Sequence, residues 1–204
     1  RQMCIRDSFM TEYKPSILVS SESDPSLATG FPLGKRFKSE LVERSCDTNV
    51  KHLGHLHRAD GRWRVYVFAD AASPRSEESK VAAWARQIEQ DPASFRNRHT
   101  PSQAPQDTVF DIKVVYQQKQ SEFAFPDVPE LFRPTTGPLG LHDVNNIFAT
   151  CQDKHGPDIF DTRGVSRDGA VVVVRPDHYV SGVFGLDEPQ KVNEFFAGVL
   201  LDQD

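Results

Sequence analysis

Three histidines in the segment HLGHLH have the residue type and spacing closest to those of a metal site; they are His52, His55 and His57. Two histidines spaced two residues apart can share a metal when they lie on a strand. A stable site needs further cysteine or carboxylate ligands, and none stands nearby at a suitable spacing. We therefore expect these histidines to be polar residues of the turn that precedes Asp60-Gly61, with no metal bound.

Three aspartates, Asp158, Asp161 and Asp168, lie close together in the sequence. Their spacing does not match an EF-hand loop, which also requires a terminal glutamate. The overlapping segment GVSRDG, residues 164–169, is one residue longer than a G-x-S-x-G nucleophile elbow. It also precedes a predicted strand, whereas the elbow connects a strand to a helix. The sequence therefore predicts neither a calcium site nor a serine hydrolase.

Neither a dinucleotide fingerprint, GxGxxG, nor a P-loop, GxxxxGK[ST], occurs in the sequence. The three cysteines, Cys4, Cys46 and Cys151, are far apart and form no CxxC motif. A thioredoxin-type redox site needs a thiol of low pKa with a resolving partner. We predict no catalytic, cofactor-binding or metal-binding residue in this chain. An isolated reactive thiol at Cys46 remains an alternative.

Length and composition describe a globular chain that suits one domain, or one domain with an extended arm. The chain has 204 residues, of which 38% are hydrophobic, and its formal net charge is −5. Residues 35–64 carry eight basic and four acidic side chains, a charge of +4 that we interpret as a solvated face. The net acidity argues against a nucleic-acid partner. No apolar run suits a membrane span, no secretory signal is present, and the odd cysteine count favours a reducing, cytoplasmic location.

The middle of the chain alternates between strand and helix patterns. Residues 63–69 form a β-branched and aromatic run that predicts a buried strand, and residues 109–117 predict a second one. Between them, Ser76 is expected to cap a helix that continues to about Gln90. That helix has a single apolar stripe, consisting of Val81, Trp84, Ala85 and Ile88. A proline-rich, irregular segment follows at residues 123–141, and Asp143 is expected to cap a short helix over Val144, Ile147 and Phe148.

The C-terminal quarter predicts a β-hairpin and a final helix. Residues 171–174 form a strand of four valines, Pro176-Asp177 forms a turn, and residues 179–184 form the partner strand. Asp187 is expected to cap the last helix, with Gln190 completing a capping box. The strand–helix–strand unit followed by a hairpin and a helix predicts an α/β fold, in which helices flank a mixed sheet in a thioredoxin-like layout.

The first 33 residues differ in character from the rest. We expect residues 1–33 to be a non-native start followed by a serine- and proline-rich connector arm, and residues 34–204 to be the thioredoxin-like domain. Residues 1–8 are predicted to be disordered, and the arm to pack poorly up to about Ser26.

Several apolar side chains have no evident partner in the core that these elements would form. They are Ile17, Leu18, Phe123, Phe125, Leu131 and Phe132. If they cluster on the surface, their combined area marks an interface. In the alternative arrangement, the proline-rich segment folds back and buries its own phenylalanines.

Four sequence blocks together resemble the C-terminal domain of FAD-dependent aromatic hydroxylases, of the phenol 2-monooxygenase and 3-hydroxybenzoate 4-monooxygenase type. They are FPLGKRF, HLGHLHRADGRWRVYVFAD, DIFDTRGVSRDGAVVVVRPDHYV and FFAGVL, within a resemblance that extends over residues 13–200. In that family FAD, substrate and NAD(P)H are handled by upstream domains, and the C-terminal domain is thioredoxin-like without CxxC. The resemblance implies a non-catalytic dimerisation domain that packs against those upstream domains and forms a homodimer.

Two alternatives from other classes stay open at this point. A thioredoxin-fold redox or glutathione-using enzyme would require a reactive, partly exposed Cys46 or Cys151 beside a positive helix N-terminus. A free-standing small-molecule binding module would require a deep apolar pocket with a few convergent polar groups.

Overall fold

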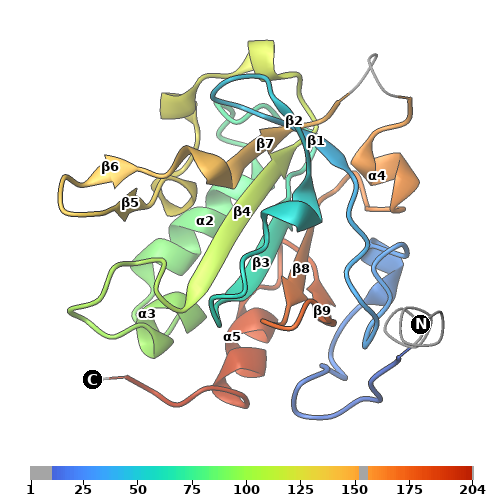
Figure 1. Cartoon of the computed structure of the whole chain (residues 1–204), viewed down its shortest axis with the longest axis vertical. Helices are drawn as coiled ribbons and strands as arrows, with labels where there is room; N and C mark the ends of the chain where they lie inside the picture. The colour runs from blue at the N-terminus through green and yellow to red at the C-terminus, as the bar shows by residue number, and fades with distance from the viewer. Residues whose placement is uncertain (1–10, 152–155, 204) are drawn as a thin grey trace, which may run out of the picture.

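A mixed seven-stranded sheet forms the centre of the computed structural model, which describes residues 11–151 and 156–203 (Figure 1). Its strand order is β2-β1-β7-β4-β3-β8-β9. The strands are β1 (Leu41–Arg44), β2 (Val50–His52), β3 (Trp63–Phe68), β4 (Phe110–Tyr116), β7 (Ile147–Ala149), β8 (Ala170–Val174) and β9 (Val180–Phe184). The helices are α2 (Lys80–Gln90), α3 (Phe95–His99), α4 (Ile159–Thr162) and α5 (Pro189–Ala197).

The connections within the sheet confirm the predicted α/β, thioredoxin-like layout. Strand β3 pairs with β4 in parallel, with Val65 opposite Ile112, and α2 forms the crossover between them. On its other side β3 pairs with β8 in antiparallel fashion, with Val65 opposite Val173, and β8 continues as a hairpin into β9 and then α5. The βαβ unit and the ββα unit therefore share one sheet.

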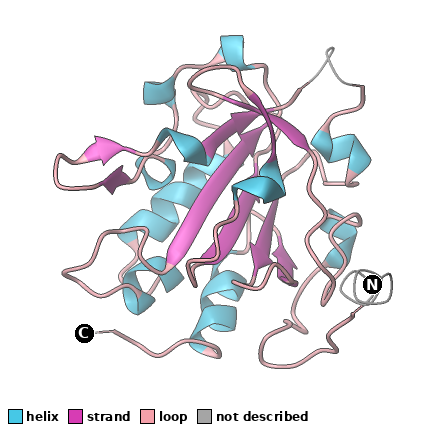
Figure 2. Cartoon of the chain, in the orientation of Figure 1, coloured by secondary structure: helices cyan, strands magenta, loops and turns pink. Residues whose placement is uncertain are grey.

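One face of the sheet is covered by helices (Figure 2). Alternate residues of a strand point to opposite faces, so Val65 and Val67 face the same way. They pack with Trp84 of α2 and Phe196 of α5 in one buried cluster. The predicted apolar stripe of α2 is confirmed, since Val81, Trp84, Ala85 and Ile88 are all buried.

The opposite face is covered mainly by irregular chain and by α4 rather than by long helices. Tyr66 and Phe68 of β3 pack against Phe31 of the N-terminal arm, Phe37 of the segment after it, and Phe160 of α4. The ring centroids of Phe37 and Tyr66 are 4.6 Å apart in a stacked arrangement.

The N-terminal arm is anchored to the sheet by its backbone, although most of its side chains up to Ser26 are exposed. Its backbone follows β9, because the N–H of Ser20 donates to the carbonyl of Ser181 at 2.8 Å and that of Asp24 to Val183 at 2.9 Å. Val19 is buried. The expectation that the arm packs poorly up to about Ser26 agrees with the exposure of most of its side chains, although its backbone covers an edge strand whose free N–H and C=O groups need partners. Residues 1–8 lie outside the described residues, and the division of the chain at residue 33 stays a prediction.

Two of the three predicted helix caps, Ser76 and Asp187, are not the caps that the structure shows. Helix α2 begins at Lys80, where the hydroxyl of Ser79, not Ser76, accepts a hydrogen bond from the N–H of Ala82. The last helix begins at Pro189 after Glu188, without the expected Asp187 cap. Proline is favoured in the first turn of a helix because it has no N–H to satisfy there, and this preference sets the start of α5.

Two further local predictions have different outcomes. Asp143 does cap a turn, but this turn is a 3-10 helix, η6 (Val144–Asn146). Ile147 and Phe148 then enter β7 instead of continuing a helix, because β7 pairs with both β1 and β4 in the buried sheet. The hairpin turn at Pro176-Asp177 is confirmed, with the N–H of His178 donating to the carbonyl of Arg175 at 2.9 Å. Among the described residues, no helix is long and apolar enough to cross a bilayer.

Candidate functional site

The histidines of HLGHLH separate into two groups in the structure. The rings of His52 and His55 lie 4.8 Å apart on the surface, whereas His57 stacks on His178 at 3.5 Å. Within residues 11–151 and 156–203, no three His, Cys, Asp or Glu side chains are arranged to hold a metal ion. His57 is buried, and this burial, followed by the positive charge of Arg64, lowers its pKa to about 3.

The aspartates of the 158–168 segment have structural roles. Asp158 caps α4 by accepting from the N–H of Asp161 at 3.0 Å. Arg167 then binds both carboxylates, at 3.0 Å from Asp158 and 2.6 Å from Asp161. The guanidinium of Arg167 also lies over the ring of Phe160, 5.0 Å from its centroid. These carboxylates are thus engaged in holding α4 to the loop before β8.

The two described cysteines, Cys46 and Cys151, are not joined to each other and lie after different strands of the sheet. Cys46 follows β1 and Cys151 follows β7, and because these strands are antiparallel the two residues lie beyond opposite ends of the pairing. Cys151 is buried. Partial burial, followed by the charge of Asp47, raises the pKa of the Cys46 thiol, which disfavours the thiolate needed for redox chemistry.

A buried charge cluster connects β3 and β4 beneath the loop that precedes β3. Arg64 and Asp111 stand opposite each other in the register, and their side chains meet at 3.0 Å. Asp111 also binds Lys113 at 2.7 Å, and Lys113 donates to the side chain of Asn146 at 2.8 Å. All four side chains are buried. Sequence reasoning missed this cluster; the signal was a basic residue inside a buried apolar strand, which requires a charged partner on a neighbouring strand.

The predicted interface residues differ in burial, because the proline-rich segment folds back onto the core. Phe123, Leu131 and Phe132 are buried in the helix-side core, so the premise that they lack a partner is wrong. Leu18 and Phe125 are partly buried against the same core. The cause is the pair of 3-10 turns η4 (Phe125–Asp127) and η5 (Glu130–Phe132), which fold the segment back onto α2 and β4. Ile17 remains 75% exposed.

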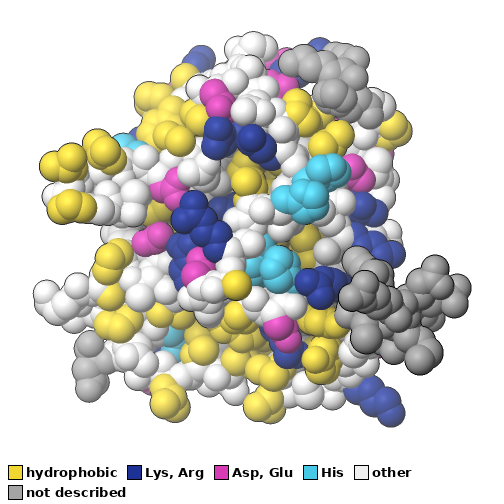
Figure 3. Space-filling model, viewed as in Figure 1, with side chains coloured by type: hydrophobic (Ala, Val, Ile, Leu, Met, Phe, Trp, Pro, Cys, Tyr) yellow, Lys and Arg dark blue, Asp and Glu magenta, His cyan; other side chains and the backbone are white. Residues whose placement is uncertain are grey.

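A protruding hairpin carries apolar side chains that sequence reasoning did not select. Strands β5 (Thr135–Thr136) and β6 (Leu141–His142) form it, and Figure 1 shows it extending from the body of the molecule. Leu139 is 81% exposed and Leu141 is 63% exposed. Figure 3 shows hydrophobic side chains gathered on the projection at this side. The hairpin is anchored at its base, where the N–H of Asp143 donates to the carbonyl of Pro134 at 2.8 Å.

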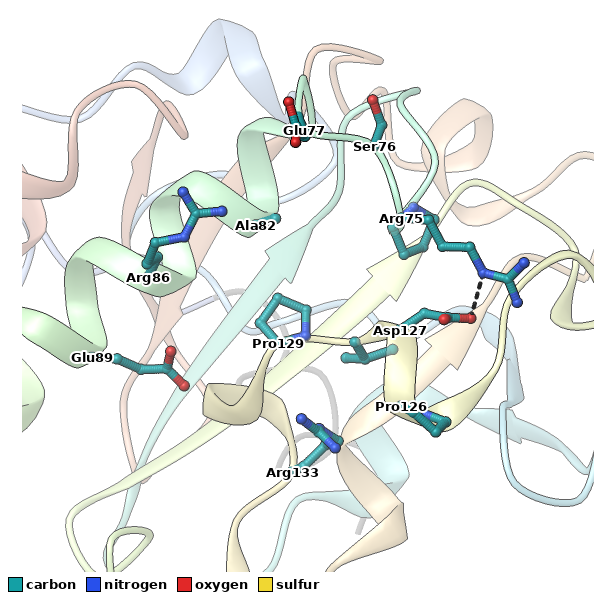
Figure 4. Close-up of a pocket in the computed structure, with 12 residues that line it drawn as sticks. Arg75, Ser76, Glu77, Ala82, Arg86, Glu89, Pro126, Asp127, Pro129 and Arg133 are labelled. Carbon is teal, nitrogen blue, oxygen red and sulfur yellow. Dashed lines mark ion pairs between the residues drawn. The ribbon is translucent and has the colours of Figure 1, made fainter.

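The loop between β3 and α2, where a thioredoxin-type enzyme would hold its cysteines, contains none. A pocket of about 390 Å³ opens beside it (Figure 4). Arg86 and Glu89 project from α2 into this region, Arg133 approaches from the facing segment, and Arg75 pairs with Asp127 at 2.8 Å on the rim. Charged side chains dominate this pocket, so it does not meet the requirement for a deep apolar binding site.

These features define the class of the protein: a thioredoxin-like α/β domain whose described residues include no paired cysteines. The chain belongs to the phenol hydroxylase C-terminal dimerisation domain family, whose match covers residues 11–204.

Two curated relatives agree with this membership. The chain is 40% identical over 191 residues to the 3-hydroxybenzoate 4-monooxygenase of Comamonas testosteroni, a match that covers 93% of this chain and 30% of that protein. It is 28% identical over 193 residues to the FAD-dependent monooxygenase terD of Aspergillus terreus, covering 92% and 31% of the two proteins. The chain thus spans about 30% of the length of these relatives.

Among solved structures, the chain is similar to a domain of a possible thiol-disulfide isomerase from Cytophaga hutchinsonii. The TM-score is 0.48 at 8% identity, covering 81% of this chain and 93% of that one. A likeness at this level says nothing about chemistry.

Proposed function

We propose that this chain is the non-catalytic dimerisation domain of an FAD-dependent, NAD(P)H-using aromatic monooxygenase. The observation that carries the proposal is the family match over residues 11–204, together with a span of only 30% of the curated relative's length. The remaining length of such a parent would hold the FAD and substrate domains. A cytoplasmic location belongs to the proposal and is supported by the exposed free thiol of Cys46.

We assign a different proposed contact to each of two exposed apolar regions. The hairpin with Leu139 and Leu141 docks against a second copy of the chain, and the arm with Ile17 faces the upstream FAD and substrate domains. The position of the arm supports this assignment, since a C-terminal domain is entered from its N-terminal side. Figure 1 shows the hairpin and the arm on different sides of the sheet, so both contacts can form at once.

Each exposed leucine has enough apolar surface to contribute to association. Burying a leucine side chain contributes about 1.5–3 kcal/mol, and a two-fold interface uses each residue twice. Leu139 and Leu141 of both copies therefore supply enough free energy to offset part of the entropy lost on association.

The redox alternative is disfavoured by the cysteines themselves. A thioredoxin-type nucleophile needs a lowered thiol pKa, and the pKa of Cys46 is raised. Cys151 is buried and offers no surface to a disulfide substrate.

Cofactor binding tests the non-catalytic part of the proposal. We expect the purified chain to be colourless after incubation with FAD and desalting, and to leave NAD(P)H unoxidised in the presence of phenols, since the phosphate-binding fingerprint is missing. A yellow protein with stoichiometric flavin would contradict it.

Capture of one copy by another tests the docking part. An immobilised tagged chain should retain an untagged chain, and Leu139→Ser with Leu141→Ser in both should abolish retention. Retention that survives this double substitution would place the contact elsewhere.

A further inference from the structure

A second pocket lies between the N-terminal arm, the 3-10 helix η2 (Leu53–Leu56) and the β8–β9 turn, and the proposed dimerisation does not use it. Its volume is about 640 Å³, within the range of roughly 300–1,000 Å³ typical of small-molecule sites. Basic side chains dominate its lining, which includes Lys35, Arg36, Lys38, His55 and His178. Figure 3 shows histidine side chains beside Lys and Arg on this face of the molecule.

The positive side chains of the pocket are paired with few acidic side chains. Glu12 is the acidic residue in the lining, and it pairs with Lys35 at 3.1 Å. Among the described residues, neither Arg36 nor Lys38 has an ion-pair partner. This concentration of positive charge occurs in a chain whose formal net charge is −5, so overall charge does not account for it.

The wall that carries these cations is held in place by backbone hydrogen bonds. The N–H of Phe37 donates to the carbonyl of His178 at 2.8 Å, and the N–H of Val180 donates to that of Lys35 at 2.9 Å. Opposite this wall, the N–H of Gly54 donates to the hydroxyl of Ser39 at 2.8 Å. The backbone that carries the basic residues is therefore held in place before any ligand arrives, so the entropy lost on binding comes mainly from their side chains.

Gly54 is required for the close approach of the two walls. A Cβ atom at this position would lie 3.0 Å from the Cβ of Ser39 and 3.3 Å from the ring of Phe37. A side chain at this position would require Ser39 and Phe37 to shift by a few tenths of an ångström. The close contact keeps His55 on the same pocket as Arg36 and Lys38.

The field inside the pocket is positive enough to act on a neighbouring histidine. Burial is the main cause that lowers the pKa of His178, and the charges of Arg36 and Arg64 lower it further. His178 stacks on His57, whose pKa is also lowered by Arg64. The ring of His178 is therefore neutral near pH 7, when its N–H group can still donate to an anion in the pocket.

We infer that this pocket binds a phosphate-bearing small molecule, with Arg36 and Lys38 as the principal anion contacts and the imidazoles of His55 and His178 as additional donors. A planar guanidinium can grip two phosphate oxygens, while an ammonium acts as a point charge. The concave shape favours a compact ligand over a flat protein surface.

Pyrophosphate is a suitable probe of the 204-residue chain at low ionic strength, measured by calorimetry and by amide chemical shifts. We expect saturable binding with shifts at Lys38 and Gly54. Arg36→Ser with Lys38→Ser should weaken affinity by at least about tenfold, because hydrogen bonds to charged groups are lost. The matched control, Lys51→Ser with Arg58→Ser, removes the same charge outside the pocket lining and should retain the affinity.

Two competition measurements distinguish a phosphate-bearing ligand from an acidic peptide. A phosphate monoester should compete with pyrophosphate, whereas a glutamate-rich peptide should not. Absence of saturable shifts up to tens of millimolar pyrophosphate, equal loss in the control variant, or tighter binding of the acidic peptide would each overturn the inference. Unfolding temperatures of both double variants, compared with that of the parent chain, identify any loss of binding that comes from misfolding. Equal association of both double variants in light scattering would keep the test independent of the dimerisation proposal.

Discussion

At the scale of single residues, the side chains that could do chemistry are occupied with structure. Asp158 caps α4 and binds Arg167, His57 is buried against His178, and Cys46 has a raised thiol pKa. The sequence predicted no metal, calcium or hydrolase site, because each of these requires a fixed set of partners at known spacing. It was insufficient to find the Arg64–Asp111 contact, which depends on the register between two strands 47 residues apart.

The buried charge cluster leads to the first prediction at this scale. Asp111→Asn should destabilise the fold by about 3–5 kcal/mol, because it leaves the ammonium of Lys113 buried without its carboxylate partner, while Arg64 keeps its ion pair with Asp60 at 2.8 Å. Asp107→Asn removes a partly exposed partner of Arg62 and should lower stability by less than about 1 kcal/mol. Urea unfolding measures both. Equal effects of the two substitutions would mean that the cluster has no special role.

His57 leads to a prediction about pH. Its pKa is about 3 in the folded chain, well below its ordinary value of 6.5. The unfolded chain therefore takes up the proton first, so the stabilisation is complete above about pH 6.5 and is lost as the pH falls. Between pH 7 and pH 5 the free energy of unfolding should drop by about 1–2 kcal/mol from this residue.

A comparison of variants isolates that contribution. His57→Phe retains a ring against His178 but cannot titrate, so its stability should depend less on pH over the same interval. His55→Gln changes an exposed histidine and should keep the slope of the parent chain. If His57→Phe shows the same slope as the parent chain, another group is responsible.

At the scale of elements, the apolar pattern of the sequence predicted the long helices and the buried strands. It did not predict where these elements end or how the irregular segments fold. The stripe of α2 and the four valines of β8 each leave a strong apolar pattern over several residues. The proline-rich segment has no such pattern, and its phenylalanines are buried through turns that depend on contacts with α2. The N-terminal arm also lacks a strong apolar pattern, and its backbone partner is the distant strand β9.

The displaced cap of α2 can be tested directly. Ser79→Ala should lower the free energy of unfolding by about 1 kcal/mol, since the hydroxyl caps the N–H of Ala82. Ser76→Ala removes a hydroxyl that accepts only from the N–H of Glu78 in a turn, and the loss should stay within about 0.5 kcal/mol. Thermal unfolding of the two variants distinguishes the caps. A larger loss for Ser76→Ala would restore the expectation based on the sequence.

At the scale of the whole molecule, the structure places the exposed apolar surface on a different part of the chain from the one that the sequence predicted. The sequence pointed to the phenylalanines of the proline-rich segment, but Phe123 and Phe132 belong to the core. Phe123→Ser should therefore unfold the chain rather than separate two copies. The exposed leucines lie farther along the same segment, on the β5–β6 hairpin. A short hairpin with a glycine-containing turn has too few residues per strand to show an alternating pattern in the sequence. This projection is therefore seen only in the folded chain.

Sedimentation equilibrium of the 204-residue chain over a wide concentration range tests the dimerisation claim most directly. We predict a reversible monomer–dimer equilibrium. Leu139→Ser with Leu141→Ser should weaken it by at least about a hundredfold, because two buried leucines are lost from each copy. Ile17→Ser, on the arm, should leave the equilibrium unchanged. A strictly monomeric mass at the highest concentration, or a dimer that the double leucine substitution does not affect, would contradict the account.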